Sequence, residues 1–215
     1  MIDIVIPNNN EEEFITIAGK LGYKELLFLY SFDNYINLKN NPNKKKEIEE
    51  KNKKIRIHYG ILADPKNIQK INTKLKDKGD FIAIKCSNIN REVIEKPKAN
   101  LVFALEEYGW KDYMHQRASG LNHILCRLAN KNKVMIGFSI SSLLDYGNQS
   151  IILGRMIQNI ILCRKFKVKT VIGSFTQNPY QMRSPHDIMS LFAILDMHEK
   201  EAKDSLENFL NYKTK

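Results

Sequence analysis

Short apolar runs recur along the chain about every 25 to 30 residues, and segments with helical patterns separate them. The run at residues 26–30 is apolar on both faces, which is typical of a parallel strand covered by helices. The predicted strands span residues 2–6, 26–30, 55–60, 80–84, 101–105, 134–139 and 170–174.

The segments between these strands predict helices. A first helix begins at Glu11 and ends at Gly22, and a long helix runs from about Gln149 to Phe166. Ser184 and Pro185 form a helix start, since serine caps a helix and proline suits its first position. Further helices are predicted at residues 65–76, 91–96 and 199–210, after the turn that opens at residue 117, and within the polar, exposed segment 40–54.

This alternation continues through the chain without a linker, a repeat or a low-complexity break. It predicts one α/β domain over residues 1–215, with a mostly parallel sheet and helices outside. About seven such strands in one domain favour a TIM-barrel-like arrangement, closed or nearly closed, over an open doubly wound sheet.

The positive charge is unevenly distributed. The net charge is +10, and residues 111–183 hold eleven Lys and Arg against two acids, whereas the rest of the chain holds 23 basic and 22 acidic residues. A lysine-rich proteome would explain many lysines, but it would not explain why acids are missing from one third of the chain. This asymmetry favours a polyanionic partner.

The composition excludes several other classes. No apolar run approaches the 18 residues of a membrane span, and the first residues lack the pattern of a signal peptide, so we expect a cytoplasmic protein without a membrane. Cys86, Cys126 and Cys163 form no CxxC pair. They predict neither a zinc knuckle nor a disulfide framework, but reduced and mostly buried thiols.

Candidate catalytic groups are scarce. The five histidines show no HxH or HExxH spacing, and the chain has no glycine-rich phosphate loop and no Gly-x-Ser-x-Gly motif. His58 stands alone near the expected end of the third strand. Ser139 and Ser141 are better explained as loop and capping residues than as nucleophiles. We therefore predict neither a catalytic nor a metal site.

The basic residues are the candidates for contacts with a polyanion such as RNA. Arginine suits phosphate because its planar guanidinium donates two parallel hydrogen bonds. Arg183 precedes a predicted helix N-terminus, where backbone N–H groups also attract anions. Arg164 and Lys165 have a simpler explanation as well, since cations near a helix end stabilise its dipole. The predicted RNA-facing residues are Arg117, His123, Arg127, Arg155, Arg164, Lys165 and Arg183.

Four ordered motifs lie in the second half of the chain. They are SGLNHILCRLA at residues 119–129, VMIGFS at 134–139, KFKV leading into VIGS at 165–174, and MRSPHD at 182–187. Their order and spacing resemble the protein component 3 family of ribonuclease P, the archaeal counterpart of the eukaryotic 30-kDa subunit.

The resemblance implies an incomplete TIM-barrel-like fold related to the PHP phosphoesterases. It implies a non-catalytic, RNA-binding protein subunit of the ribonucleoprotein that removes the 5′ leader from precursor tRNA, with the RNA subunit as catalyst. The implied partners are the RNase P RNA, protein component 2 (the Pop5-like subunit) and other RNase P proteins, with precursor tRNA contacted indirectly. No cofactor of its own is implied, although the RNA of the holoenzyme is expected to need magnesium.

The chain departs from the family pattern at three positions. Gly137 stands where the family usually has an acid, and Ala118 and Asn122 stand where it often has Asp. Two other functions stay open at this point. One is a PHP-like metal-dependent phosphoesterase, which bound zinc or manganese would favour. The other is a protein-assembly module without RNA contact.

Overall fold

The computed structural model of the chain describes residues 1–50, 54–65, 67–75, 79–86, 90–96, 99–108, 111–112, 117–144 and 147–213. The strands are β1 (Ile2–Val5), β2 (Glu25–Ser31), β3 (Arg56–Ala63), β4 (Ile82–Lys85), β5 (Leu101–Phe103), β6 (Met135–Ser139) and β7 (Thr170–Gly173). The helices are α1 (Glu11–Leu21), α2 (Phe32–Asn40), α3 (Pro42–Glu50), α4 (Ile68–Lys74), α5 (Asn90–Glu95), α6 (His123–Asn132), α7 (Gln149–Lys165), α8 (Pro185–Ile194) and α9 (Glu199–Lys213). Short 3-10 turns are η1 (Leu105–Glu107), η2 (Ser141–Leu143) and η3 (Pro179–Gln181).

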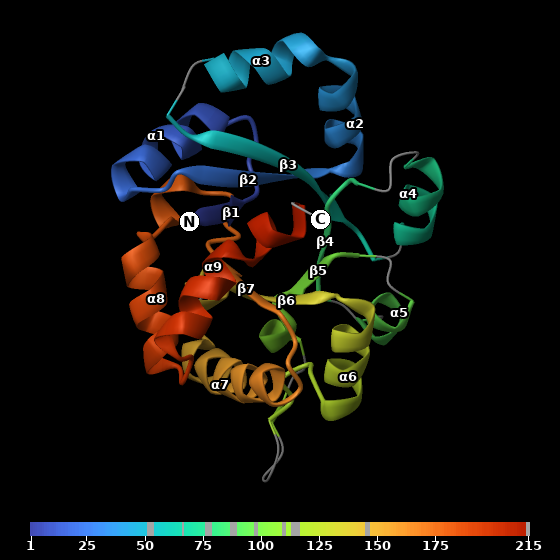
Figure 1. Cartoon of the computed structure of the whole chain (residues 1–215), viewed down its shortest axis with the longest axis vertical. Coiled ribbons are helices and arrows are strands. Elements are labelled where there is room, and N and C mark those ends of the chain that lie inside the picture. The colour runs from blue at the N-terminus through green and yellow to red at the C-terminus, as the bar shows by residue number, and fades with distance from the viewer. Residues whose placement is uncertain are drawn as a thin grey trace.

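The strands form one parallel sheet in which their spatial order is their order in the chain. The sheet curves into a nearly closed barrel, and α1 to α8 surround it (Figure 1). This confirms the predicted TIM-barrel-like fold of about seven strands.

A seam separates β1 from β7, since no ladder of paired residues joins these two strands in the described chain. A few hydrogen bonds bridge the seam instead. The backbone N–H of Phe175 donates to the carbonyl of Ile4 at 2.7 Å. The buried carboxylate of Asp3 accepts from the N–H and the hydroxyl of Ser174 at 2.7 and 2.6 Å. Burial raises the pKa of Asp3 to about 6, against the effect of these hydrogen bonds.

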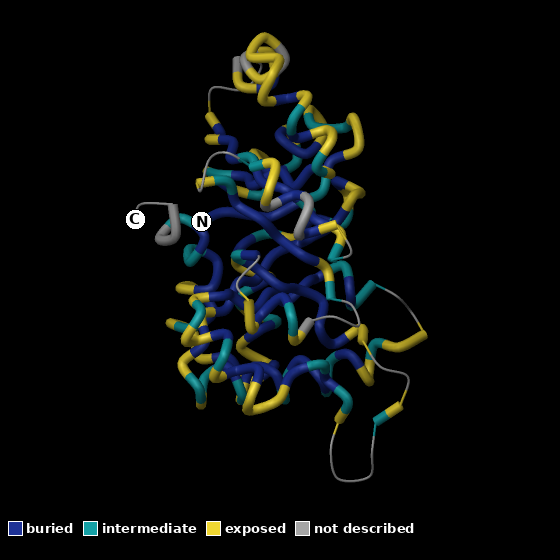
Figure 2. The backbone as a smooth tube through the Cα atoms, turned by 90° about the vertical axis from the view of Figure 1, so that its right-hand side faces the viewer, coloured by how far each residue is buried: buried dark blue, intermediate teal, exposed yellow. Residues whose placement is uncertain are grey.

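The core has two layers, as the two faces of a covered parallel sheet require. One layer lies between the sheet and the outer helices, and the other fills the barrel. Figure 2 shows buried backbone running through the middle of the molecule, with exposed residues on the outer elements. Inside the barrel, the rings of Phe103 and Phe175 stack with centroids 4.4 Å apart.

Helix α9 crosses the amino end of the barrel, inside the ring of helices (Figure 1). Asn208 of this helix donates to the carbonyl of Thr170, the first residue of β7, at 2.8 Å. Phe209 enters the barrel interior, where its ring lies edge-on to Phe81 at 4.8 Å. The end of the chain therefore closes one mouth of the barrel.

Gly137 faces the barrel interior beside these aromatic rings. A Cβ at this position would lie 2.7 Å from the Cβ of Phe103, closer than real Cβ contacts. A larger side chain, such as an acid, would therefore not fit at this position without a shift of β5.

Several local predictions were wrong. Helix α2 was not predicted, because its sequence is mostly polar and it is stabilised by burying Tyr35 and Leu38. Helix α4 begins at Ile68, after Pro65 rather than around it. Strand β3 continues to Ala63, so His58 lies near its beginning.

The end of the polar segment, residues 51–53, lies outside the described residues, as does His115. No helix of the described chain is both long and apolar enough to cross a membrane.

Candidate nucleic-acid interface

Helices α6 and α7 lie side by side on the outside of the barrel (Figure 1). Helix α6 begins sharply because Asn122 caps it, accepting from the N–H of Leu125 at 2.9 Å. Gly120 precedes this cap with a φ of +74°, and a Cβ there would collide with the carbonyl oxygen of Leu105. The turn therefore needs glycine, and it delivers the chain from Arg117 into α6 in a fixed direction.

Four of the predicted residues gather on the outer side of these two helices. His123 and Arg127 are exposed one turn apart on α6. The guanidinium of Arg127 and the ammonium of Lys165 lie 5.6 and 5.9 Å from the ring centre of Phe166, which places the middle of α6 beside the end of α7. We call the surface made by Arg117, His123, Arg127 and Lys165 the α6–α7 surface.

Arg117 reaches the α6–α7 surface from the turn before α6. Its guanidinium lies on the backbone of α7 at Gly154, where a Cβ would collide with it. The side-chain amide of Gln158 donates to the carbonyl of Arg117 at 3.1 Å. The side chain of Arg117 stays 50% exposed, with one long contact of 3.7 Å to Asp112.

Carboxylates are scarce at the α6–α7 surface, where Asp112 contacts Arg117 alone among its four members in the described chain. Residues 117–144 and 147–183 contain no Asp or Glu. Across the described chain, no carboxylate forms an ion pair with His123, Arg127 or Lys165. Arg127 and Lys165 are therefore available to an external anion without first breaking an ion pair within the described chain.

Arg155 does not face outward, as the predicted RNA contact would require, because its side chain is only 4% exposed. Its Nε donates to Asp112 at 2.8 Å, and its Nη1 donates to the carbonyls of Glu106 and Tyr108 at 2.9 and 3.3 Å. Arg155 thus fastens the segment after β5 onto α7. Although partial burial opposes it, hydrogen bonds from the N–H of Ala118 and from Arg155 hold the pKa of Asp112 below its usual value.

Arg164 faces away from the α6–α7 surface, toward α9. Its guanidinium pairs with Asp196 at 3.1 Å and with Glu201 at 2.9 Å, and it also donates to the carbonyl of Asp196. The side chain is 30% exposed. Two carboxylates already satisfy this arginine, so it joins α7 to the start of α9.

Arg183 is exposed but lies elsewhere, just before α8. Its Nη1 donates to the backbone carbonyls of Tyr180 and Met182 at 3.3 and 2.8 Å. The predicted cap of the next helix is confirmed, since the hydroxyl of Ser184 accepts from the N–H of Asp187 at 3.2 Å. The structure therefore groups four of the seven predicted residues and separates Arg155, Arg164 and Arg183 from them.

The carboxyl edge of the sheet, where barrels usually carry their active sites, holds a self-contained polar cluster. Glu107 pairs with Lys85 at 2.7 Å and accepts from the hydroxyl of Ser142 at 2.5 Å. The neighbouring Glu106 is fully buried, and neither carboxyl oxygen has a hydrogen-bond partner within the described residues. Burial raises the pKa of Glu106 to about 8, so this carboxyl is protonated at neutral pH.

Metal-ligating side chains do not converge on this edge. In the described parts of the chain, no group of three or more His, Cys, Asp or Glu is arranged to hold a metal ion. His58 lies at the other end of the barrel, where its Nε2 is 2.6 Å from Glu25. The edge offers hydroxyls and one ion pair, but no ligand set for metal-assisted hydrolysis.

Sequence reasoning missed the residues that organise the α6–α7 surface. The ring of Phe166 contacts both Arg127 and Lys165. Asp112 binds Arg155 and thereby holds this one arginine inside the fold. Phe166 follows two basic residues in the chain, which is a weak signal for a cation–π contact. No local pattern pairs Asp112 with Arg155, because they are 43 positions apart in sequence.

The sequence places the chain in a known family. A sequence model described as RNase P subunit p30 matches residues 1–211. The chain belongs to the RNase P subunit p30 family. The ribonuclease P protein component 3 of Methanothermobacter thermautotrophicus is 26% identical over 198 residues, covering 88% of this chain and 77% of the relative. That of Methanocaldococcus jannaschii is 27% identical over 192 residues, covering 86% and 78%.

Solved structures show that the p30-family fold is shared more widely. A chain in the cryo-EM structure of archaeal ribonuclease P with mature tRNA matches with a TM-score of 0.77 at 23% identity, covering 100% of this chain and 90% of that one. The crystal structure of an amidohydrolase matches with a TM-score of 0.60 at 8% identity, covering 100% and 75%. The same barrel thus occurs in a ribonucleoprotein and in a hydrolase.

Proposed function

We propose that this chain is a non-catalytic, RNA-binding protein subunit of ribonuclease P, which supports removal of the 5′ leader from precursor tRNA by the catalytic RNA. Membership of the p30 family supports this role, as does the name that its relatives carry. The observation that carries the RNA contact is the α6–α7 surface, where Arg127 and Lys165 are exposed and form no ion pair within the described residues. Lysine and arginine there would neutralise backbone phosphates.

The two alternatives are less well supported. A metal-dependent phosphoesterase needs three or four converging ligands, and the described residues offer no such group. A pure assembly module would not need a surface from which carboxylates are missing over two helices. The magnesium that the holoenzyme is expected to need would serve the catalytic RNA rather than this chain. The expected partners are that RNA, protein component 2 (Pop5-like) and the other protein subunits, and the expected place is the cytoplasm.

Reconstitution tests the proposed role directly. The cognate RNA and the other protein subunits are assembled with and without this chain, and cleavage of precursor tRNA is followed at moderate magnesium. We expect slower cleavage when the chain is omitted, and no cleavage by the chain alone. Unchanged cleavage without the chain would contradict the proposal, and cleavage by the metal-loaded chain alone would revive the phosphoesterase.

Binding measurements test the assigned surface. The double variant Arg127→Ala with Lys165→Ala removes two unpaired cations, so we expect weaker binding to the RNase P RNA and a salt dependence flatter by about one unit of slope for each lost phosphate contact. A matched control is Lys20→Ala with Lys24→Ala, two exposed lysines at the end of α1, away from α6 and α7 (Figure 1). Equal losses in both double variants would mean that binding depends on total charge and not on this surface.

A further inference from the structure

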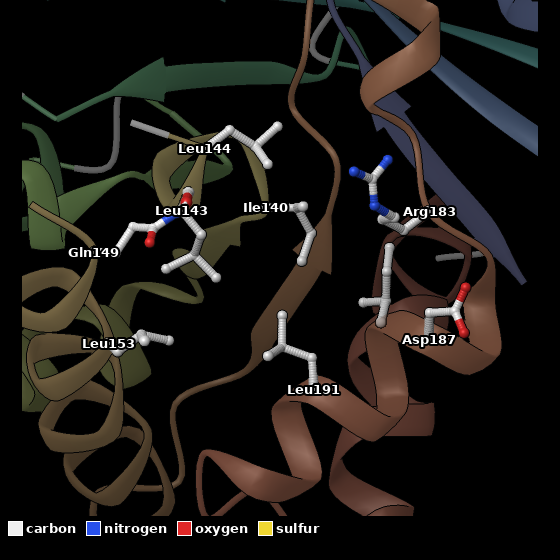
Figure 3. Close-up of a pocket in the computed structure, with 9 residues that line it drawn as sticks. Ile140, Leu143, Leu144, Gln149, Leu153, Arg183, Asp187 and Leu191 are labelled. Carbon is white, nitrogen blue, oxygen red and sulfur yellow. Dashed lines mark hydrogen bonds between the residues drawn. The ribbon is translucent and has the colours of Figure 1, made fainter. Parts of the chain in front are cut away.

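An apolar groove lies between the start of α7 and helix α8. Its volume is about 360 Å³. One wall comes from η2 and α7, and the other from α8, with Ile140, the residue after β6, between them (Figure 3). The side chains that make it apolar are Ile140, Leu143, Leu144, Leu153, Ile188 and Leu191.

The polar groups at this groove have hydrogen-bond partners within the chain, and the guanidinium of Arg183 donates to the backbone carbonyls of Tyr180 and Met182. The amide of Gln149 donates to the carbonyl of Leu143 at 2.8 Å, and Asp187 accepts from the hydroxyl of Ser184 at 2.8 Å while pointing away from the groove (Figure 3). The guanidinium of Arg183 reaches toward the gap between the walls, and no carboxylate in the described chain pairs with it. The groove is therefore mostly apolar, and at its edge it presents the guanidinium of Arg183, which donates to carbonyls but has no carboxylate partner among the described residues.

This chemistry fits a protein better than RNA. The lining contains no aromatic ring on which a base could stack, and a single cation cannot follow a phosphate backbone. Aliphatic walls made by two helices suit the apolar face of a third helix, whose side chains at i and i+4 can enter the same groove. Tyr180, which is 76% exposed beside Arg183, extends the surface with a residue type enriched in protein interfaces.

We propose that the α7–α8 groove binds an amphipathic helix of another protein subunit of the same ribonucleoprotein, with an acidic residue of that helix paired with Arg183. This inference rests on the proposed function, because it takes its partner from the ribonuclease P assembly. It reassigns Arg183 from RNA to a protein contact. Helix α7 then separates two partners, with RNA on the side shared with α6 and protein on the side shared with α8.

The test measures the affinity of the full chain for each cognate RNase P protein subunit in turn, starting with protein component 2. Leu191→Asp places a charge in the groove and should weaken binding by about thirty-fold or more, as expected for a central interface residue. Arg183→Glu should weaken it by about tenfold, mostly through repulsion of the acid. The matched control is Ile194→Asp, on the same helix, 80% exposed and outside the groove lining.

Leu191 is half-buried, so thermal unfolding of each variant accompanies the affinities. If Leu191→Asp unfolds, the affinity of Arg183→Glu decides the test, because Arg183 is exposed and its substitution should leave the fold intact. Losses in both groove variants with wild-type binding by Ile194→Asp would support the proposal. Restored binding when the partner's acid is exchanged for lysine opposite Arg183→Glu would establish the pairing.

Other outcomes would overturn the groove proposal without deciding whether the chain is a ribonuclease P subunit. If a subunit binds wild type and both groove variants equally, the groove is not the interface, although the chain still acts within the assembly. If the variants lose self-association or RNA affinity instead, the occupant is a second copy or RNA. If no subunit binds, the groove proposal fails, and the cleavage assay then decides the proposed function separately.

Discussion

Helix α7 and its neighbours hold cations in two different settings. On the inner side, Arg155 and Arg164 are surrounded by carboxylates and carbonyls that come from distant parts of the chain. On the outer side, Arg127 and Lys165 contact the ring of Phe166 and have no acidic partner in the described chain. The comparison teaches that a basic segment combines two functions. Its paired cations hold the fold together, and its unpaired cations remain for a ligand.

The largest effect on stability should come from Arg155→Met. This change leaves two carbonyl oxygens and the partly exposed Asp112 without their buried donor, and unsatisfied acceptors of this kind cost about 1 to 3 kcal/mol of unfolding free energy. Urea denaturation measures the loss. The comparison variant Arg127→Met should change the same quantity by less than about 0.5 kcal/mol. Similar losses in the two variants would break the distinction between inner and outer cations.

Glu106 should make the stability depend on pH. Its pKa is raised from 4.5 to about 8 in the folded chain, so its contribution is fully present below pH 4.5 and is lost as the pH rises through 8. Between pH 6 and 8, one proton bound more tightly by the folded state corresponds to a loss of about 2 kcal/mol. Denaturation at several pH values measures this slope. In Glu106→Gln the slope should flatten, and an unchanged slope would assign it to another group.

Arg164→Ala should have a smaller effect, because its ion pairs with Asp196 and Glu201 are partly open to solvent. We expect a loss of about 1 kcal/mol of unfolding free energy, reduced at high salt. Lys200→Ala, an exposed cation on α9, serves as the control. A loss in Arg164→Ala that does not respond to salt would point to packing of the side chain rather than to its charge.

The smallest effect on stability should come from the double variant Arg127→Ala with Lys165→Ala. Exposed cation–π contacts with Phe166 contribute about 0.5 kcal/mol each, and no ion pair with a described residue is lost. Thermal unfolding should therefore be close to wild type while RNA affinity falls. A large loss of stability would show that these residues support the fold after all, and would remove them from the proposed RNA contact.

Much of the fold could be predicted from the sequence, because parallel strands covered on both faces leave a strong local signal. All seven strands were located, and Ser184 was recognised as a cap from its neighbours alone. Helix α2 was missed, because its polar sequence is helical only through burial of Tyr35 and Leu38 against the sheet. Local sequence patterns do not show how much stability a helix gains by packing against the sheet.

The site was predicted less completely than the fold. Charge asymmetry located the segment, and the exposed positions His123, Arg127 and Lys165 share a surface in the structure. The same asymmetry could not separate Arg155 from Arg127, since both are arginines on helices next to apolar residues. Their difference comes from Asp112, which approaches Arg155 only once the chain has folded.

The seam bears on how the chain is made. Because the strands follow one another around the barrel in the order of their synthesis, each can pair with its predecessor soon after it leaves the ribosome. Closure is different, because Asp3 and Ser174 are separated by 171 positions. Strand β1 must wait with an open edge until the last strand arrives, and unpaired edges invite pairing with other chains. A charged side chain on an open edge discourages such pairing, and in the folded barrel the carboxylate of Asp3 accepts from Ser174 across the seam.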